Sequence, residues 1–206
     1  MPAFVSRFQK RVEDLVNEHR SLCGLNDQGK PSAPVLNRSL HVDYITKSLR
    51  EVGRGYSGLD ASRTWMCYWG LHSLNILGAP PSHFQKAEIL AFLKTCQHPD
   101  GGFGGGPGQY AHLAPTYASV MALACLQMED ALSAIDLQSL SRFLHRMKQP
   151  DGSFTMHGGG EADIRGTYCA LAVAALCGLL SDELKNGVAE WIIRCVFFCF
   201  YVASLI

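Results

Sequence analysis

A five-residue turn that occurs twice decides the fold: Pro99-Asp-Gly-Gly-Phe103 and Pro150-Asp-Gly-Ser-Phe154. The second copy follows the first at an offset of 51 residues (99 to 150), and the pair Thr116-Tyr117 returns at the same offset as Thr167-Tyr168. A related pair, Thr64-Trp65, lies 52 residues before Thr116. Landmarks that return at one spacing indicate a repeat architecture in which each unit is one supersecondary element.

Each repeat predicts two helices of different character. The first is amphipathic, as over residues 137–147, where apolar side chains recur at helical spacing. The Pro-Asp-Gly turn ends this helix because Pro and Gly cannot extend it. The second helix is expected to open at the Thr-Tyr pair, and residues 117–126 and 168–176 are apolar on every side of it.

This alternation predicts an all-α fold. A helix without a polar face has to be covered, so we expect a ring of apolar helices inside a ring of amphipathic ones, with the connecting loops at one mouth. A simple α-solenoid has the same periodicity, and the period alone therefore does not identify a function. We expect an N-terminal extension at 1–35, partly irregular with a helical piece around 8–20, repeats at 36–195, and an apolar tail at 196–206.

Composition excludes several classes of function. The chain has 206 residues and a formal net charge of zero, so it has no electrostatic footprint for nucleic acid or an anionic membrane. The charge-free tail is too short for an integral membrane protein. No secretory signal precedes the eight cysteines, and none of these forms a C-x-x-C pair. We therefore expect a cytoplasmic protein with reduced, buried cysteines.

Motifs for direct catalysis are lacking. The glycine-rich run from Gly101 to Gly108 has neither the G-x-G-x-x-G register nor a following G-K-[ST], so these glycines are interpreted as conformational. The eight histidines are scattered along the sequence. On these grounds we assign no catalytic residue and no metal ligand within the chain.

Three blocks of sequence resemble the β-subunit family of protein farnesyltransferases. They are Cys96–Tyr117, Asp60–Trp69 and Gly159–Cys169, and the likeness extends from about Leu36 to Cys195. The family has an α/α toroid fold, and the resemblance implies that residues 36–195 form only its N-terminal half. Terpene cyclases share the toroid but need a D-x-D-D motif, which does not occur here.

The resemblance also implies roles for individual residues. Trp65, Arg165 and Tyr168 are expected to contact the farnesyl chain, and Trp65 to limit its length. The expected residues of the site for a C-terminal CaaX peptide (a cysteine, two aliphatic residues and a variable last residue) are Ala61, Ser62, Trp65, Trp69, His112, Ala114, Pro115, Glu161 and Arg165. In this family, His112, Glu161 and Arg165 would hold a water that binds the peptide carboxylate.

The residues by themselves leave other interpretations open. Trp65 and Trp69 are four positions apart, and aromatic residues at this spacing are more typical of core packing. Tyr168 fits core packing as well. Arg165 fits a structural ion pair with Glu161 or with Asp163.

The implied activity is transfer of farnesyl from farnesyl diphosphate to the cysteine thiol of CaaX proteins. The family works as a heterodimer with an α-subunit and uses a zinc ion. The resemblance places the zinc ligands and most diphosphate-binding residues beyond the end of this chain, so we predict a truncation after about Cys195 and no activity alone. Two alternatives remain: a non-catalytic fragment that binds the α-subunit or peptides, and a relative of the geranylgeranyltransferase β-subunits.

Overall fold

The computed structural model describes residues 7–22 and 36–203, and the chain divides into two units, Met1–Leu40 and His41–Ile206. The first unit contains α1 (Arg7–Leu22), which confirms the helix predicted around residues 8–20. Val12 and Leu15 are exposed on this helix. The expected irregular part of the N-terminal extension, at 1–6 and 23–35, lies outside the described residues.

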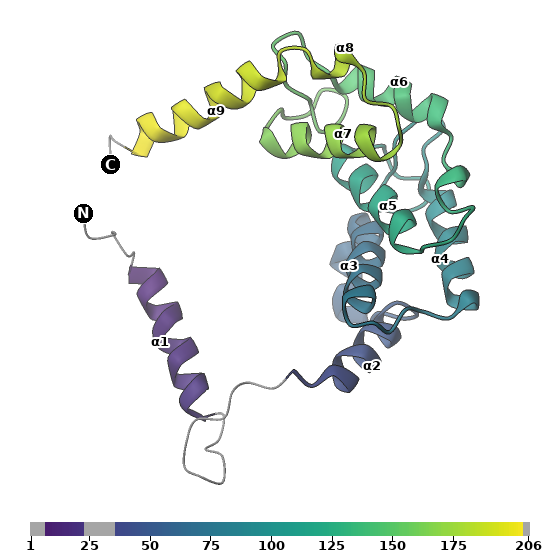
Figure 1. The fold of residues 1–206 in the computed structure, drawn as a ribbon, viewed down its shortest axis with the longest axis vertical. Coiled ribbons are helices and arrows are strands. Elements are labelled where there is room, and N and C mark those ends of the chain that lie inside the picture. Colours follow the sequence, from purple (N-terminus) through teal and green to yellow (C-terminus); the bar gives the residue numbers. More distant parts are fainter. Residues whose placement is uncertain (1–6, 23–35, 204–206) are drawn as a thin grey trace. The chain divides into compact units, whose positions relative to one another are not determined.

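The second unit is built from helices, and the described residues contain no β-strand, only isolated bridges. The elements in chain order are α2 (Arg38–Ser48), the 3₁₀ helix η1 (Arg54–Ser62), α3 (Arg63–Ile76), α4 (His83–Cys96), α5 (Leu113–Cys125), the 3₁₀ helix η2 (Leu132–Ala134), α6 (Leu137–Met147), α7 (Ile164–Leu176), α8 (Asp182–Lys185) and α9 (Val188–Ala203). Helix α5 packs between α3 and α7, while α4 and α6 lie on one side of this row (Figure 1). The predicted alternation of inner and outer helices is confirmed.

The outer helices bury one face and are capped by side chains. On α6 the buried residues are Leu140, Phe143, Leu144 and Met147 together with Ser139. The Asp136 carboxylate accepts a hydrogen bond from the Ser139 backbone amide at 3.0 Å, and so satisfies one of the free amides at the start of the helix. No described helix combines the length and the apolar composition that a bilayer crossing requires.

The inner helices begin three residues earlier than predicted. Helix α5 starts at Leu113 and α7 at Ile164, so each Thr-Tyr pair lies one turn inside its helix. The cause is the preceding side chain. The His112 ring nitrogen accepts from the Ala114 amide, and the Asp163 carboxylate accepts from the Arg165 amide, so each residue is the N-cap.

Burial differs between the inner helices α5 and α7. Helix α5, between its two neighbours, buries nine of its residues. Helix α7 leaves an apolar face exposed, on which Tyr168 is 62% accessible and Leu176 is 42% accessible. The expectation that an apolar helix is covered on every side therefore holds for α5 and fails for α7 in this chain.

Each Pro-Asp-Gly turn brings two stretches of backbone into close approach. Gly101 and Gly152 have φ of +89° and +93°, a region that residues with a Cβ rarely adopt. A Cβ on Gly101 would lie 1.9 Å from the Ser139 carbonyl oxygen, and one on Gly152 would lie 2.0 Å from the Gly187 carbonyl oxygen. The turn therefore packs directly against the chain at the next outer helix.

A side chain before each turn reaches the next repeat. The Gln97 side-chain oxygen accepts from the Asp136 backbone amide at 3.0 Å, and its NH₂ group donates to the Asp136 carbonyl at 3.1 Å. The residue at the equivalent position is Lys148, whose ammonium group donates to the Asn186 carbonyl at 2.7 Å. Different side chains thus form the same connection between successive repeats.

A buried threonine links the first turn to its inner helix. The Thr116 hydroxyl accepts from the Phe103 amide at 2.8 Å and donates to the His112 carbonyl at 2.8 Å. The equivalent Thr167 is also buried, yet its hydroxyl has no hydrogen-bond partner. The same residue at the same repeat position therefore has a different energetic role.

This difference predicts unequal effects of one substitution. Thr116→Val removes two hydrogen bonds and leaves the buried Phe103 amide unpaired, so we expect the free energy of unfolding to fall by about 1–3 kcal/mol. Thr167→Val removes no hydrogen bond, and we expect it to change stability by less than about 1 kcal/mol. Urea denaturation followed by circular dichroism measures both. Equal losses in the two variants would contradict this explanation.

Candidate functional site

A cavity of about 900 Å³ opens where the first turn of α3 meets the first turn of α5. Six of the predicted peptide-binding residues line it, namely Ala61, Ser62, Trp65, His112, Ala114 and Pro115. Trp69, Glu161, Arg165 and Tyr168 are not among its lining residues. The structure thus brings the greater part of the predicted peptide site together around one cavity.

The wall that holds Ala61 and Ser62 is fixed by the glycine-rich loop. The Gln109 side chain donates to the Asp60 carboxylate at 2.8 Å, and the Thr64 amide donates to the Gly105 carbonyl at 3.3 Å. Arg63 pairs with Asp60 at 3.3 Å. A Cβ on Gly105 would lie 1.8 Å from the Ala61 carbonyl oxygen, so the loop follows η1 closely because this residue is a glycine.

His112 is held in one tautomer by its surroundings. Its Nδ1 accepts from the Ala114 amide at 3.1 Å, so the neutral ring carries its proton on Nε2. Burial lowers the pKa of His112, the nearby His157 lowers it further, and Glu161 opposes this shift. The His157 ring lies 5.5 Å from that of His112, because the Met156 carbonyl accepts from the Leu113 amide.

Arg165 forms an ion pair at the start of α7. Its guanidinium donates to the Asp163 carboxylate at 2.6 Å, and its nearest approach to Glu161 is 4.0 Å. This pair holds the pKa of Asp163 below its ordinary value and raises that of Arg165. The structural ion pair is therefore with Asp163, and Arg165 remains largely exposed beside the cavity.

An aromatic cluster extends from the cavity across the inner helices. Trp65 lies 5.4 Å from Trp69 and 5.8 Å from Tyr117, measured between ring centroids. Tyr117 in turn lies 5.5 Å from Tyr168 and 5.9 Å from Tyr68. Two residues predicted to bind farnesyl, Trp65 and Tyr168, are therefore connected through the ring of Tyr117.

Sequence reasoning missed Tyr117, although a signal was present. Tyr117 occupies the position in its repeat that Tyr168 occupies in the next, so the repeat itself places both on corresponding faces of inner helices. Six further lining residues were missed as well, and only His98 and Asp100 among them lie within a motif. They are His98, Asp100, Phe143, Arg146, Met147 and His157.

Trp69 belongs to a different hollow. It is 54% exposed and lines a cavity of about 220 Å³ together with Tyr56, Leu59 and Met66. The Tyr44 and Tyr56 hydroxyls are 3.1 Å apart at this second cavity. Trp69 therefore contacts the aromatic cluster on one side and this apolar hollow on the other.

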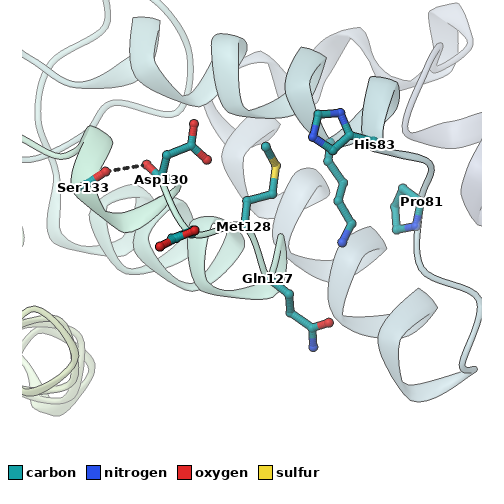
Figure 2. A pocket seen from close by; sticks show the side chains of 8 residues that line it. Pro81, His83, Gln127, Met128, Asp130 and Ser133 are labelled. Atoms are coloured by element: carbon teal, nitrogen blue, oxygen red, sulfur yellow. Dashed lines mark hydrogen bonds between the residues drawn. The ribbon is translucent and has the colours of Figure 1, made fainter.

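A third hollow, of about 610 Å³, lies at the other ends of the helices, between the start of α4 and the end of α5 (Figure 2). Gln127, with φ of +52°, follows the end of α5 there. The Ser133 hydroxyl donates to the Asp130 carbonyl at 2.9 Å. No predicted site residue lines this hollow.

Burial disfavours the reactive thiolate form of four cysteines. Burial raises the pKa of Cys67 to about 12 and that of Cys96, Cys169 and Cys177 to about 11. These groups are protonated at neutral pH, whereas a metal ligand or nucleophile is the thiolate. Within the described ranges, no group of three His, Cys, Asp or Glu residues could hold a metal ion, so a zinc ion does not fit these residues.

Comparison with known proteins places the chain among prenyltransferases. The family model described as prenyltransferase alpha-alpha toroid domain matches residues 36–198. The protein farnesyltransferase subunit beta of Arabidopsis thaliana is 44% identical over 160 residues, which cover 78% of this chain and 33% of that protein. The protein farnesyltransferase subunit beta of Saccharomyces cerevisiae is 36% identical over 180 residues, which cover 85% of this chain and 42% of that protein.

A geranylgeranyl transferase type-2 subunit beta of Saccharomyces cerevisiae is also similar, at 32% identity over 129 residues, covering 62% of this chain and 39% of that protein. The chain spans 33% to 42% of the length of these three relatives.

The capping role of His112 predicts a pH dependence of stability. Its folded-state pKa is lower than the unfolded value, so the unfolded chain binds this proton more readily and acid favours unfolding. We expect stability to fall as the pH drops below about 6.5, the ordinary histidine pKa. His112→Asn keeps an N-cap acceptor without a titrating ring, so its stability should fall less over this window.

Urea denaturation between neutral and mildly acidic pH measures this difference. His112→Ala serves as the control for loss of the cap and should lower stability by about 1 kcal/mol at neutral pH. Identical pH profiles for the wild type and His112→Asn would contradict the assigned role of the ring.

Proposed function

The chain belongs to the prenyltransferase alpha-alpha toroid family, and from that premise we propose that it forms part of the β-subunit of a protein farnesyltransferase. In this proposal, farnesyl diphosphate and a CaaX peptide are the substrates, an α-subunit is the partner, and the complex is cytoplasmic and uses zinc. The most similar sequences reported above carry the β-subunit name, which supports the assignment.

The position of Trp65 carries the proposal. This side chain lines the 900 Å³ cavity and also belongs to the aromatic cluster that includes Tyr117 and Tyr168. An apolar wall of stacked rings suits an isoprenoid chain, and a cavity with a few polar groups suits a peptide end. One residue therefore adjoins both of the surfaces that a prenyl transfer to a peptide requires.

In the proposed complex, the described residues bind and orient the substrates. The neutral His112 offers an Nε2–H donor at the cavity. Arg165 offers an exposed guanidinium that forms an ion pair with the Asp163 carboxylate. Such groups suit a carboxylate held through a water molecule. Since a zinc ion does not fit the described residues, we assign them no bond-making step and expect weak or no transfer from this chain.

A relative of the geranylgeranyltransferase β-subunits is the second candidate. The similarity to the yeast type-2 subunit favours it. The size of the side chain at position 65 separates the two, because a large ring there shortens the space for the lipid. A binding fragment without chemistry is the third candidate, and the exposed apolar face of α7 fits it.

A lipid-binding experiment tests the assignment. Equilibrium dialysis with radiolabelled farnesyl diphosphate and geranylgeranyl diphosphate should show tighter binding of the shorter lipid by the wild type. Trp65→Ala removes a large apolar contact, so we expect about tenfold weaker binding of farnesyl diphosphate and a smaller preference over the longer lipid. Phe84→Ala, an exposed ring outside the aromatic cluster, is the matched control.

The same chain, co-expressed with the α-subunit, should then be assayed for transfer of labelled farnesyl to a CaaX peptide. The zinc content of that sample should be measured as well. Preference for the longer lipid in the wild type would favour the geranylgeranyl assignment. Binding of neither lipid would contradict the lipid-binding role proposed for the aromatic cluster. Robust zinc-dependent transfer would contradict the expectation that this chain is weak or inactive.

A further inference from the structure

The cavity has a cationic side chain that no motif predicted. Arg146 lies in the last turn of α6, is exposed, and lines the cavity together with Ala114 and Pro115. Its guanidinium is held in two ways: it lies 5.9 Å from the centroid of the Phe143 ring, and it donates to the Asp100 carbonyl. The charge is therefore fixed in position at the edge of the cavity.

This charge has no carboxylate partner in the described part of the chain. The basic members of the ion pairs there are Arg63, His98, His145, Arg165 and Lys185, and none of the pairs includes Arg146. The cavity's own carboxylate, Asp100, lies 3.7 Å from His98 Nδ1. Since only one donor of Arg146 is used, by a carbonyl, the remaining N–H groups are free to bind an anionic oxygen.

The surroundings limit which anion this would be. Phe143 and Met147, from the same helix as Arg146, and Pro115 are buried residues that also line the cavity. A ligand group that enters must place aliphatic carbons against these side chains and its charge at the rim. An acidic side chain, two or three carbons long and ending in a carboxylate, meets both requirements.

We propose that Arg146 is a specificity-determining residue, which makes this cavity favour peptides whose last side chain bears a carboxylate. The inference rests on the proposed peptide-binding function and adds a preference that the predicted site residues do not supply. Ala61, Ser62, Ala114 and Pro115 carry no charge, so they distinguish last residues by size and shape alone.

Fluorescence anisotropy with labelled peptides and the purified 206-residue chain tests the proposal. Three peptides ending in Cys-Val-Ile-Glu, Cys-Val-Ile-Gln and Cys-Val-Ile-Met compare acid, isosteric amide and thioether at the last position. We expect the wild type to bind the Glu peptide about three- to fivefold more tightly than the Gln peptide, as for a partly exposed charge pair. High salt should reduce this ratio because it screens exposed charges.

Three variants test whether Arg146 causes the preference for Glu over Gln. Arg146→Gln should lose the preference for Glu over Gln, and Arg146→Lys should retain part of it because the charge remains. Arg142→Gln removes an exposed arginine of the same helix that does not line the cavity, and it should leave the ratio unchanged. A thermal melt of each variant by circular dichroism shows whether it is folded.

The outcomes distinguish a failure of the role of Arg146 from a failure of the proposed peptide site. Peptide binding with no preference for Glu, or a preference that survives in folded Arg146→Gln, would overturn the role of Arg146 and leave the proposed function standing. Failure of all three peptides to bind the wild type would overturn the proposed peptide site, and the inference with it.

Discussion

The architecture depends on one close approach, in which the glycine of each Pro-Asp-Gly turn touches the backbone of the next outer segment. Gly101 meets Ser139 in α6, and Gly152 meets Gly187 just before α9. Any side chain at either glycine would push the two segments apart. Phe103 and Phe154, which end the turns, are completely buried behind this contact. The turn therefore fixes where each outer helix begins, and through it the spacing of the repeats.

The candidate site follows from this spacing. Because the turns and loops of successive repeats lie at the same end of the helices, residues far apart in sequence, from Ala61 to His157, line one cavity. The helix starts contribute their caps to it, since His112 both begins α5 and forms part of the lining. Fold and site thus use the same residues, and a change that moves a helix start also moves a group of the site.

Sequence predicted the features that repeat and missed those that depend on contacts between repeats. The alternation of helices follows from periodicity, and the shared location of Ala61, Ser62 and His112 was implied by the family resemblance. The predicted helix starts were wrong because His112, an unusual N-cap, extends α5 by a turn and Asp163 does the same for α7. The place of Arg146 at the cavity has no signal in sequence, since it exists only once α6 packs against the preceding turn. Thr116 and Thr167 differ only in their three-dimensional partners.

The shared position of Trp65 has a thermodynamic consequence. Trp65 lines the cavity and also belongs to the aromatic cluster, so in the proposed function a ligand at either place would contact this one ring. If the first ligand changes the orientation or freedom of the indole, it changes the affinity for the second by some factor. By linkage, the second changes the affinity for the first by the same factor. Cooperativity between lipid and peptide then needs no conformational change beyond a single side chain.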